Sequence, residues 1–186
     1  MTGRRGDAGP EREDEGAAVR GRAPGAAQAT AERLVEAMRA RDRFSAWLGL
    51  DVVALAPGTC RVRAAVRDEM LNGFGVCHGG VTFALADSAL AFASNTHGRV
   101  TMSIENGISY VAPVAVGDVL TATAEEEGVA GRLAFYRVMV RKQDGSTVAI
   151  FRGTVYRTQR ELLAESTGQS TGQRTGERTE EHGSDG

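Results

Sequence analysis

The sequence predicts an α+β fold in which one antiparallel β-sheet wraps around a single long, buried helix. Residues 79–95 are almost wholly apolar or small, and a helix that is apolar nearly all round must be buried. Four strand-like segments follow this helix along the chain and are joined by short turns. No second helix separates them, which excludes the crossovers of a parallel sheet. One sheet around one helix is therefore the simplest arrangement.

The chain divides into one domain and two tails. It has 186 residues, of which 41% are hydrophobic, so it can bury a real core. Residues 1–28 are rich in Gly, Ala, Arg, Glu and Pro without any apolar period, which predicts a disordered N-terminal tail. Residues 161–186 are expected to form a disordered, low-complexity C-terminal tail, because residues 166–177 repeat Ser, Thr, Gly and Gln with a period of four and offer no apolar residue to bury. The folded domain is expected at residues 29–160.

Charge and hydropathy exclude several classes of partner. A net charge of -2 gives no electrostatic reason to expect a nucleic acid or a membrane surface. No segment approaches the ~20 apolar residues of a membrane helix. The pair Arg4-Arg5 lacks the apolar stretch that an export signal needs. We expect a cytoplasmic protein in which Cys60 and Cys77 stay reduced.

The elements before and including the buried helix follow from local patterns. Residues 31–48 place apolar side chains mostly at helical spacing, which predicts an amphipathic helix with Thr30 as its N-cap. Residues 60–66 alternate apolar side chains with Arg and Ala, which predicts a half-buried strand. Residues 79–95 form the buried helix, and Gly98 lies just past its end.

The strands after the helix are bounded by turn residues. Pro113 follows the first, Gly117-Asp118 precedes the second, and Asp144-Gly145 is a strong hairpin signal before the last. We expect the four strands to pair in chain order as an antiparallel meander. They span residues 100–111, 119–126, 133–142 and 147–158.

Polar residues that could carry chemistry gather around the start of the buried helix. Asn72-Gly73 precedes His78-Gly79-Gly80, and Asp87 stands eight residues beyond the first glycine of that run. This combination is specific, and residues 42–158 as a whole resemble the PaaI-type (phenylacetic acid degradation) branch of the hotdog-fold thioesterases. The resemblance is also carried by Phe44-Ser45-Ala46-Trp47-Leu48-Gly49-Leu50, Leu85-Ala86-Asp87-Ser88-Ala89, Tyr110-Val111-Ala112-Pro113 and Phe151-Arg152-Gly153.

The resemblance implies a hotdog fold and hydrolysis of an acyl-CoA to the free acid and CoA. An aryl-acetyl or similar short acyl group, as in phenylacetate degradation, fits the family. Water is the co-substrate, and neither a metal nor an organic cofactor is expected. The three histidines His78, His97 and His182 are scattered and provide no ligand set for a metal.

Gly79 and Asp87 are the central catalytic candidates. Gly79 begins the buried helix, so its N–H is one of the unpaired donors of a helix start, and the helix dipole adds to its polarity. The resemblance assigns this N–H to the thioester carbonyl, whose developing oxyanion it would stabilise. The resemblance also makes Asp87 the catalytic carboxylate, acting either as a general base on water or as a nucleophile on the acyl carbon.

The spacing of these two residues predicts an oligomer. Eight residues along one helix separate Gly79 from Asp87 by roughly 12 Å, too far for both to act on one carbonyl. We therefore expect Gly79 of one chain to work with Asp87 of another. The family builds such a site by joining two sheets edge to edge with antiparallel helices, as a homodimer or as a dimer of dimers, which would be a homotetramer.

The other motif residues have two open interpretations each. Asn72 and His78 are implied to orient the thioester, the water or the helix start, and His78 either acts as a base or caps the helix. Gly80 and Ser88 are assigned to substrate binding, with Ser88 assisting the water or bonding locally. Phe83 lines an acyl pocket with Phe74 and Met102, or all three pack in the core.

A basic rim should receive the phosphates of CoA. Arg152, Arg157 and Arg99 are candidates, and the alternative for each is a solvated surface arginine. Many relatives carry an acidic residue and an arginine where this chain has Ser109 and Ala112.

Three other functions fit less well. A hotdog dehydratase places its His after its Asp, whereas His78 precedes Asp87. A non-catalytic acyl-CoA-binding or regulatory module has no need of a carboxylate in a buried helix. A thiol nucleophile at Cys77 is disfavoured because Cys and His work together through spatial and rarely through sequential adjacency.

Overall fold

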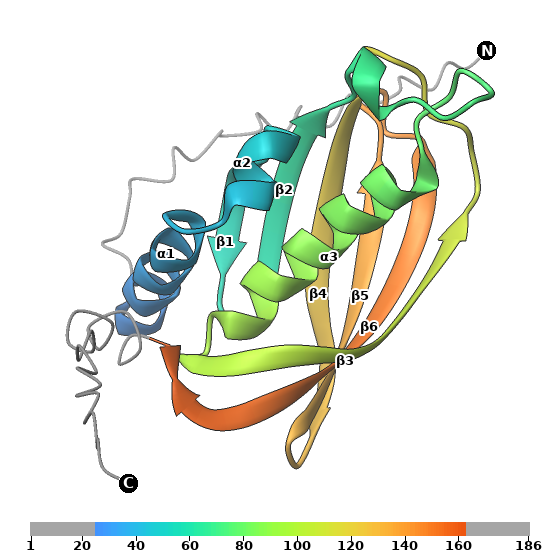
Figure 1. Ribbon diagram of the computed structural model, residues 1–186. Coiled ribbons are helices and arrows are strands. Elements are labelled where there is room, and N and C mark those ends of the chain that lie inside the picture. Colours follow the sequence, from blue (N-terminus) through green and yellow to red (C-terminus); the bar gives the residue numbers. More distant parts are fainter. Residues whose placement is uncertain (1–24, 163–186) are drawn as a thin grey trace, which may run out of the picture.

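The computed structural model describes residues 25–162, in which a six-stranded antiparallel sheet curves around one long helix (Figure 1). The predicted tails lie almost entirely outside these residues, although the first helix begins at Ala26, ahead of the expected domain boundary at residue 29. The elements are α1 (Ala26–Arg39), α2 (Arg43–Leu48), β1 (Asp51–Ala56), β2 (Thr59–Ala65), a 3-10 turn (Asp68–Met70), α3 (Gly79–Asn95), β3 (Arg99–Tyr110), β4 (Val119–Ala130), β5 (Leu133–Arg141) and β6 (Thr147–Glu161).

The order of the strands differs from the predicted meander. The sheet runs β1-β2-β4-β5-β6-β3, so β4, β5 and β6 form a meander but β3 pairs with β6 and not with β4. The reason lies in α3, whose 17 residues span roughly 25 Å and carry the chain from β2 across the sheet to its far edge. β2 then pairs with β4, and β3 is left as an edge strand.

The N-terminal part differs from the prediction in three respects. The single helix expected over residues 31–48 is two helices, because Asp42 caps a new one by accepting a hydrogen bond from the Ser45 N–H (2.9 Å). Thr30 is not an N-cap; it lies inside α1 and its hydroxyl donates to the Ala26 carbonyl. The strand β1 was not predicted, since its side chains show no clean alternation of buried and exposed positions.

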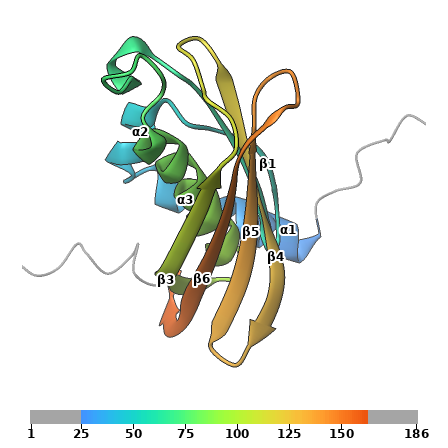
Figure 2. The ribbon, with the colours of Figure 1, turned by 90° about the vertical axis from the view of Figure 1, so that its right-hand side faces the viewer.

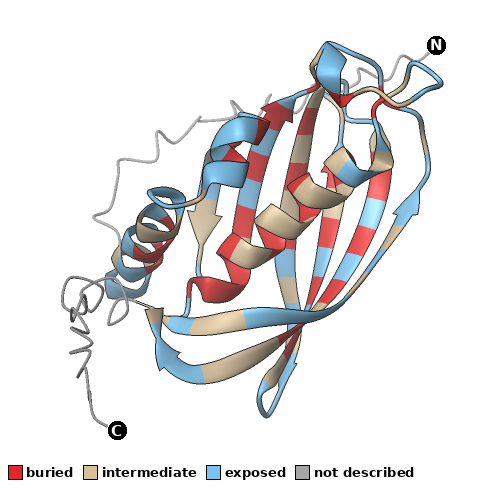
Figure 3. Ribbon diagram, in the orientation of Figure 1, coloured by how far each residue is buried: buried red, intermediate tan, exposed pale blue. Residues whose placement is uncertain are grey.

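The central helix has the predicted bounds and forms the core of the domain. Leu85, Ala86, Ala89, Leu90 and Phe92 are each at most 1% exposed. The inward positions of the strands alternate with exposed ones and are buried against the helix (Figure 3). Seen from the side, α3 lies against one face of the strands β3 to β6 (Figure 2). The α+β prediction of a sheet wrapped around a buried helix is confirmed.

Candidate active site

The loop before α3 is folded by Asn72. Its backbone N–H donates to the Val76 carbonyl, and its side-chain oxygen accepts from the Phe74 N–H at 2.9 Å. Gly75 adopts a φ of 73°, which favours glycine. These contacts close a tight turn that places His78 at the start of α3. Within the single chain, Asn72 therefore determines the shape of the loop.

His78 caps α3. Its Nδ1 accepts a hydrogen bond from the Gly80 N–H at 2.9 Å, and its carbonyl accepts from the Val81 N–H. A Cβ at residue 80 would lie 2.9 Å from Nδ1, so glycine is needed for the cap. The same lone pair of Nδ1 is unavailable to a proton of water, which favours the capping interpretation of His78. The Gly80 N–H is likewise engaged by His78.

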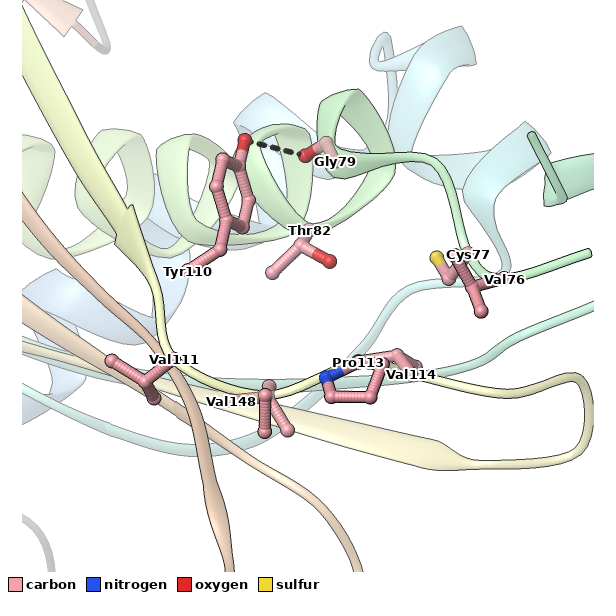
Figure 4. Close-up of a pocket in the computed structure, with 10 residues that line it drawn as sticks. Val76, Cys77, Gly79, Thr82, Tyr110, Val111, Pro113, Val114 and Val148 are labelled. Carbon is pink, nitrogen blue, oxygen red and sulfur yellow. Dashed lines mark hydrogen bonds between the residues drawn. The ribbon is translucent and has the colours of Figure 1, made fainter. Parts of the chain in front are cut away.

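Gly79 differs from its neighbours at this helix start. Its N–H has no acceptor among residues 25–162, whereas its carbonyl accepts a hydrogen bond from the Tyr110 hydroxyl at 2.9 Å (Figure 4). A Cβ at residue 79 would lie 3.0 Å from the Tyr110 ring, so glycine lets the tyrosine cover the backbone closely. The helix therefore begins with one polarised donor that lacks a partner within the described chain.

A cavity of about 430 Å³ adjoins this donor. It lies between the start of α3 and the segment after β3, and its size suits a short acyl or aryl group. Cys77 is on its wall, and burial raises the pKa of this thiol, so it stays protonated and is a poor nucleophile. The lining residues are Val76, Cys77, Gly79, Thr82, Tyr110, Val111, Ala112, Pro113, Val114 and Val148 (Figure 4).

Asp87 lies half-buried in the middle of α3. Burial raises the pKa of its carboxyl group, and a hydrogen bond from Asn106 acts in the opposite direction. The Asn106 Nδ2 donates to Asp87 Oδ1 at 2.9 Å. Asn106 lies on β3, and the sequence did not indicate it, because this contact depends on β3 being placed beside both α3 and β6. The Ser88 hydroxyl, expected to bond locally or to assist the water, makes no hydrogen bond among the described residues.

One chain does not bring Gly79 and Asp87 together. Both lie on the same uninterrupted helix, so eight residues separate them by roughly 12 Å along its axis. Asp87 is also absent from the lining of the cavity beside Gly79. The two central candidates thus occupy separate surfaces of the single chain.

The remaining candidates fall in different places. Phe83 is half-buried and packs edge-on against Phe151, with ring centroids 5.3 Å apart, so it borders the core. Arg152 projects from the exposed positions of β6 into a hollow that Glu105 and Phe135 also line. Arg157 lies in a separate pocket that Arg99 and Arg132 also line. The free thiols of Cys60 and Cys77 are both buried and unpaired.

The fold and this helix start define a thioesterase of the hotdog type. A sheet wraps a buried helix whose first N–H finds no acceptor within residues 25–162, and a carboxylate lies farther along the same helix. A sequence profile of the thioesterase superfamily matches residues 74–149. The chain belongs to this superfamily, and within it to the PaaI-type branch predicted from the sequence.

Individual relatives support this assignment. The acyl-coenzyme A thioesterase PaaI of Escherichia coli is 35% identical over 130 residues, which cover 70% of this chain and 93% of the relative. Its solved structure has a TM-score of 0.71 at 34% identity and covers 72% of this chain and 97% of its own. A putative esterase of Archaeoglobus fulgidus is 35% identical over 70% of this chain and 84% of the relative. A protein of Streptococcus mutans, solved bound to acetyl CoA, has a TM-score of 0.57 at 27% identity, covering 59% of this chain and 88% of its own.

None of the helices in residues 25–162 is long and apolar enough to cross a membrane. In the same range, no three His, Cys, Asp or Glu side chains are grouped so that they could hold a metal ion.

Proposed function

We propose that the enzyme hydrolyses a short or aryl-substituted acyl-CoA, such as an aryl-acetyl-CoA, to the free acid and CoA. The observation that carries this proposal is the unpaired Gly79 N–H beside an apolar cavity. A thioester carbonyl that accepts this hydrogen bond is polarised by the dipole of α3, and the oxyanion formed on attack is stabilised more strongly still. The relatives named as an acyl-coenzyme A thioesterase or solved with acetyl CoA support CoA as the thiol.

Asp87 supplies the second half of the reaction. As a general base it takes a proton from water while the hydroxyl adds to the carbonyl carbon, and the departing CoA thiolate then takes that proton. As a nucleophile its carboxylate displaces the thiolate to give a mixed anhydride, which water then hydrolyses. Both routes need an ionised carboxylate next to the carbonyl carbon that Gly79 holds.

The active site is completed by a second copy of the chain. β3 is an edge strand, and Met102 and Ile104 on it are each 58% exposed, so pairing with another β3 would cover apolar surface. In an antiparallel pairing, the start of one α3 faces the middle of the other, which supports a site made from Gly79 of one chain and Asp87 of its partner. The assembly is a homodimer or a dimer of dimers, and the cytoplasm suits its CoA substrate.

The phosphates of CoA bind in the arginine pocket, formed by Arg99, Arg132 and Arg157. It has a volume of about 210 Å³, and none of the three guanidinium groups forms an ion pair with residues 25–162. The Arg132 Nη1 is held by the Tyr156 hydroxyl at 2.7 Å. Three guanidinium groups that form no ion pair with the described residues, gathered around one hollow, favour an anion with several oxygens, such as a phosphate.

The arginine pocket is tested with Arg132→Gln. We expect the KM for an acyl-CoA to rise roughly tenfold, because one charge-assisted contact to phosphate is lost. The KM for the matching acyl-pantetheine thioester, which has no nucleotide phosphates, should stay the same. Arg61→Gln, at an exposed position of β2, is the matched control and should leave both constants unchanged. An equal rise with both substrates would refute a phosphate-binding role.

The main test is thiol release from a panel of acyl-CoAs by the wild-type enzyme and by Asp87→Asn. The wild type should turn over aryl-acetyl and short acyl substrates, and the variant should lose at least a hundredfold in kcat, a typical contribution of a catalytic acid or base. Full activity of Asp87→Asn would remove the carboxylate from the mechanism. Tight binding without turnover by either protein would instead establish a non-catalytic acyl-CoA-binding module.

A further inference from the structure

Asp87 has a single polar partner within residues 25–162, and that partner holds only one of its two oxygens. The Asn106 Nδ2 donates to Oδ1 at 2.9 Å, and no hydrogen bond from the described residues reaches Oδ2. This hydrogen bond joins α3 to β3, and β6 lies beside β3 in the sheet (Figure 1). The carboxylate is thus fixed at one oxygen and open at the other.

The orientation of the Asn106 amide is itself fixed. The Ser103 hydroxyl donates to Asn106 Oδ1 at 2.8 Å, so the NH2 group must point the other way, toward Asp87. Residues three apart on a regular strand face opposite sides. The register of β3 against β6 shifts between Ser103 and Glu105, and such a bulge brings Ser103 and Asn106 to the same side.

Space for the amide comes from Gly153. This residue pairs with Asn106 across β3 and β6, and a Cβ built on it would lie 2.7 Å from Asn106 Oδ1 and 2.5 Å from Leu90 Cδ2. Any larger residue would displace either the amide or a core leucine. Three segments distant in sequence therefore combine to hold one side chain against Asp87.

We propose that Asn106 is a positioning residue for thioester hydrolysis, which holds Oδ1 of Asp87 so that Oδ2 faces the attacking water or the acyl carbon. The proposal rests on the catalytic role of Asp87 given above. A donor to the charged form of a carboxylate favours ionisation, and burial opposes it. Asn106 thus keeps Asp87 ionised at a site where its apolar surroundings favour the neutral acid.

The test is the pH dependence of kcat in Asn106→Leu, which removes the amide but keeps a side chain of similar shape. We expect kcat to fall roughly 10- to 100-fold with KM nearly unchanged, and the acidic limb to move to higher pH. The shift has this direction because the lost donor had favoured the ionised form. Ser103→Ala frees the amide to rotate and should shift the limb in the same direction by a smaller amount.

Thr154→Val is the matched control. It removes a hydrogen bond to Glu105 (3.3 Å) from the same pair of strands and should leave the acidic limb in place. An unmoved limb in Asn106→Leu overturns the proposal, as does an equal shift in Thr154→Val. If Asn106→Leu does not fold, Ser103→Ala provides the test: a shifted acidic limb supports the proposal, and an unmoved limb overturns it. If Asp87→Asn loses activity but the acidic limb does not move in Asn106→Leu, only the role of Asn106 is refuted. If Asp87→Asn keeps full activity, the proposed function itself is refuted.

Discussion

The start of α3 and the middle of α3 are built in different ways. At the start, the cap joins His78 to Gly80, two residues apart, and Asn72 folds its own loop. In the middle, Asp87 depends on Asn106, 19 residues away on another strand, and on the space left by Gly153. A helix start can thus be specified by a short run of sequence, whereas the surroundings of a carboxylate inside a helix are specified by the fold.

The largest expected effect is on activity, and it shows whether the start and the middle of α3 contribute to the same active site. Gly79→Pro removes the N–H at the first position of the helix, where the backbone accepts proline and the Tyr110 ring, 3.0 Å from the new Cβ, must shift slightly. Asp87→Ala removes the carboxylate. Each variant alone should lose at least a hundredfold in activity. After subunit exchange of an equal mixture, half of the dimers are mixed and each has one intact site, so about a quarter of wild-type activity should return. The readout is thiol release after mixing.

Subunit exchange is checked separately with differently tagged chains. A chain that carries both substitutions, mixed with Asp87→Ala, is the control and should recover nothing. If mixed dimers form and activity does not return, then Gly79 and Asp87 do not act across the interface. Full activity in either single variant would exclude the altered residue from the reaction.

The same contrast explains which parts of the site could be predicted. The bounds of α3 and the capping role of His78 follow from residues adjacent in sequence. Asn106 could not be predicted, because it contacts Asp87 only when β3 lies at the far edge of the sheet beside β6. The predicted meander placed β3 next to β4. Gly153 belongs to a motif that the sequence shows. Only the packing explains why this position is a glycine, since a Cβ there would collide with Asn106 and Leu90.

The fold shows the same limit of local patterns. Alternation identified β2, and strand-like segments bounded by turn residues identified β3, β4, β5 and β6. β1 was missed because it is a largely exposed edge strand with a register shift between Val52 and Ala54. The break between α1 and α2 was missed because the apolar spacing continues through Phe44 and Trp47, which are 49% and 54% exposed.

A smaller effect separates the two interpretations of His78. Replacement by Asn keeps an N-cap acceptor but no imidazole, and replacement by Ala removes both. If His78 acts by capping, His78→Ala should lower stability by about 1 kcal/mol and His78→Asn should retain both stability and most of kcat. Chemical denaturation and kcat measured on both variants provide the check. Loss of kcat in a stable His78→Asn would show that the imidazole takes part in the chemistry.

The smallest expected effect is on thermal stability, and it compares the half-buried carboxylate of Asp87 with an exposed carboxylate. Burial raises the pKa of Asp87 in the folded state, so the native protein binds its proton more tightly than the unfolded chain does. The ionised group therefore lowers stability at pH values above its raised pKa, and this cost disappears below the ordinary pKa of aspartate, where both states are protonated. Asp87→Asn should thus raise the Tm at pH 7 to 8 by about 2 °C, with the gain vanishing toward low pH.

Asp144 provides the control of opposite sign. Hydrogen bonds from Ser146 lower the pKa of this exposed carboxyl group, so its ionised form contributes stability that is lost as the pH falls. Asp144→Asn should therefore leave the Tm unchanged or slightly lower at neutral pH. A Tm of Asp87→Asn that is equal to or below that of the wild type throughout this range would mean that Asn106 compensates fully for burial of the charge. Asp87 would then be a structural residue whose charge is fully compensated by its hydrogen bond. The claim that the folded protein keeps this carboxylate ionised at the expense of stability would be wrong.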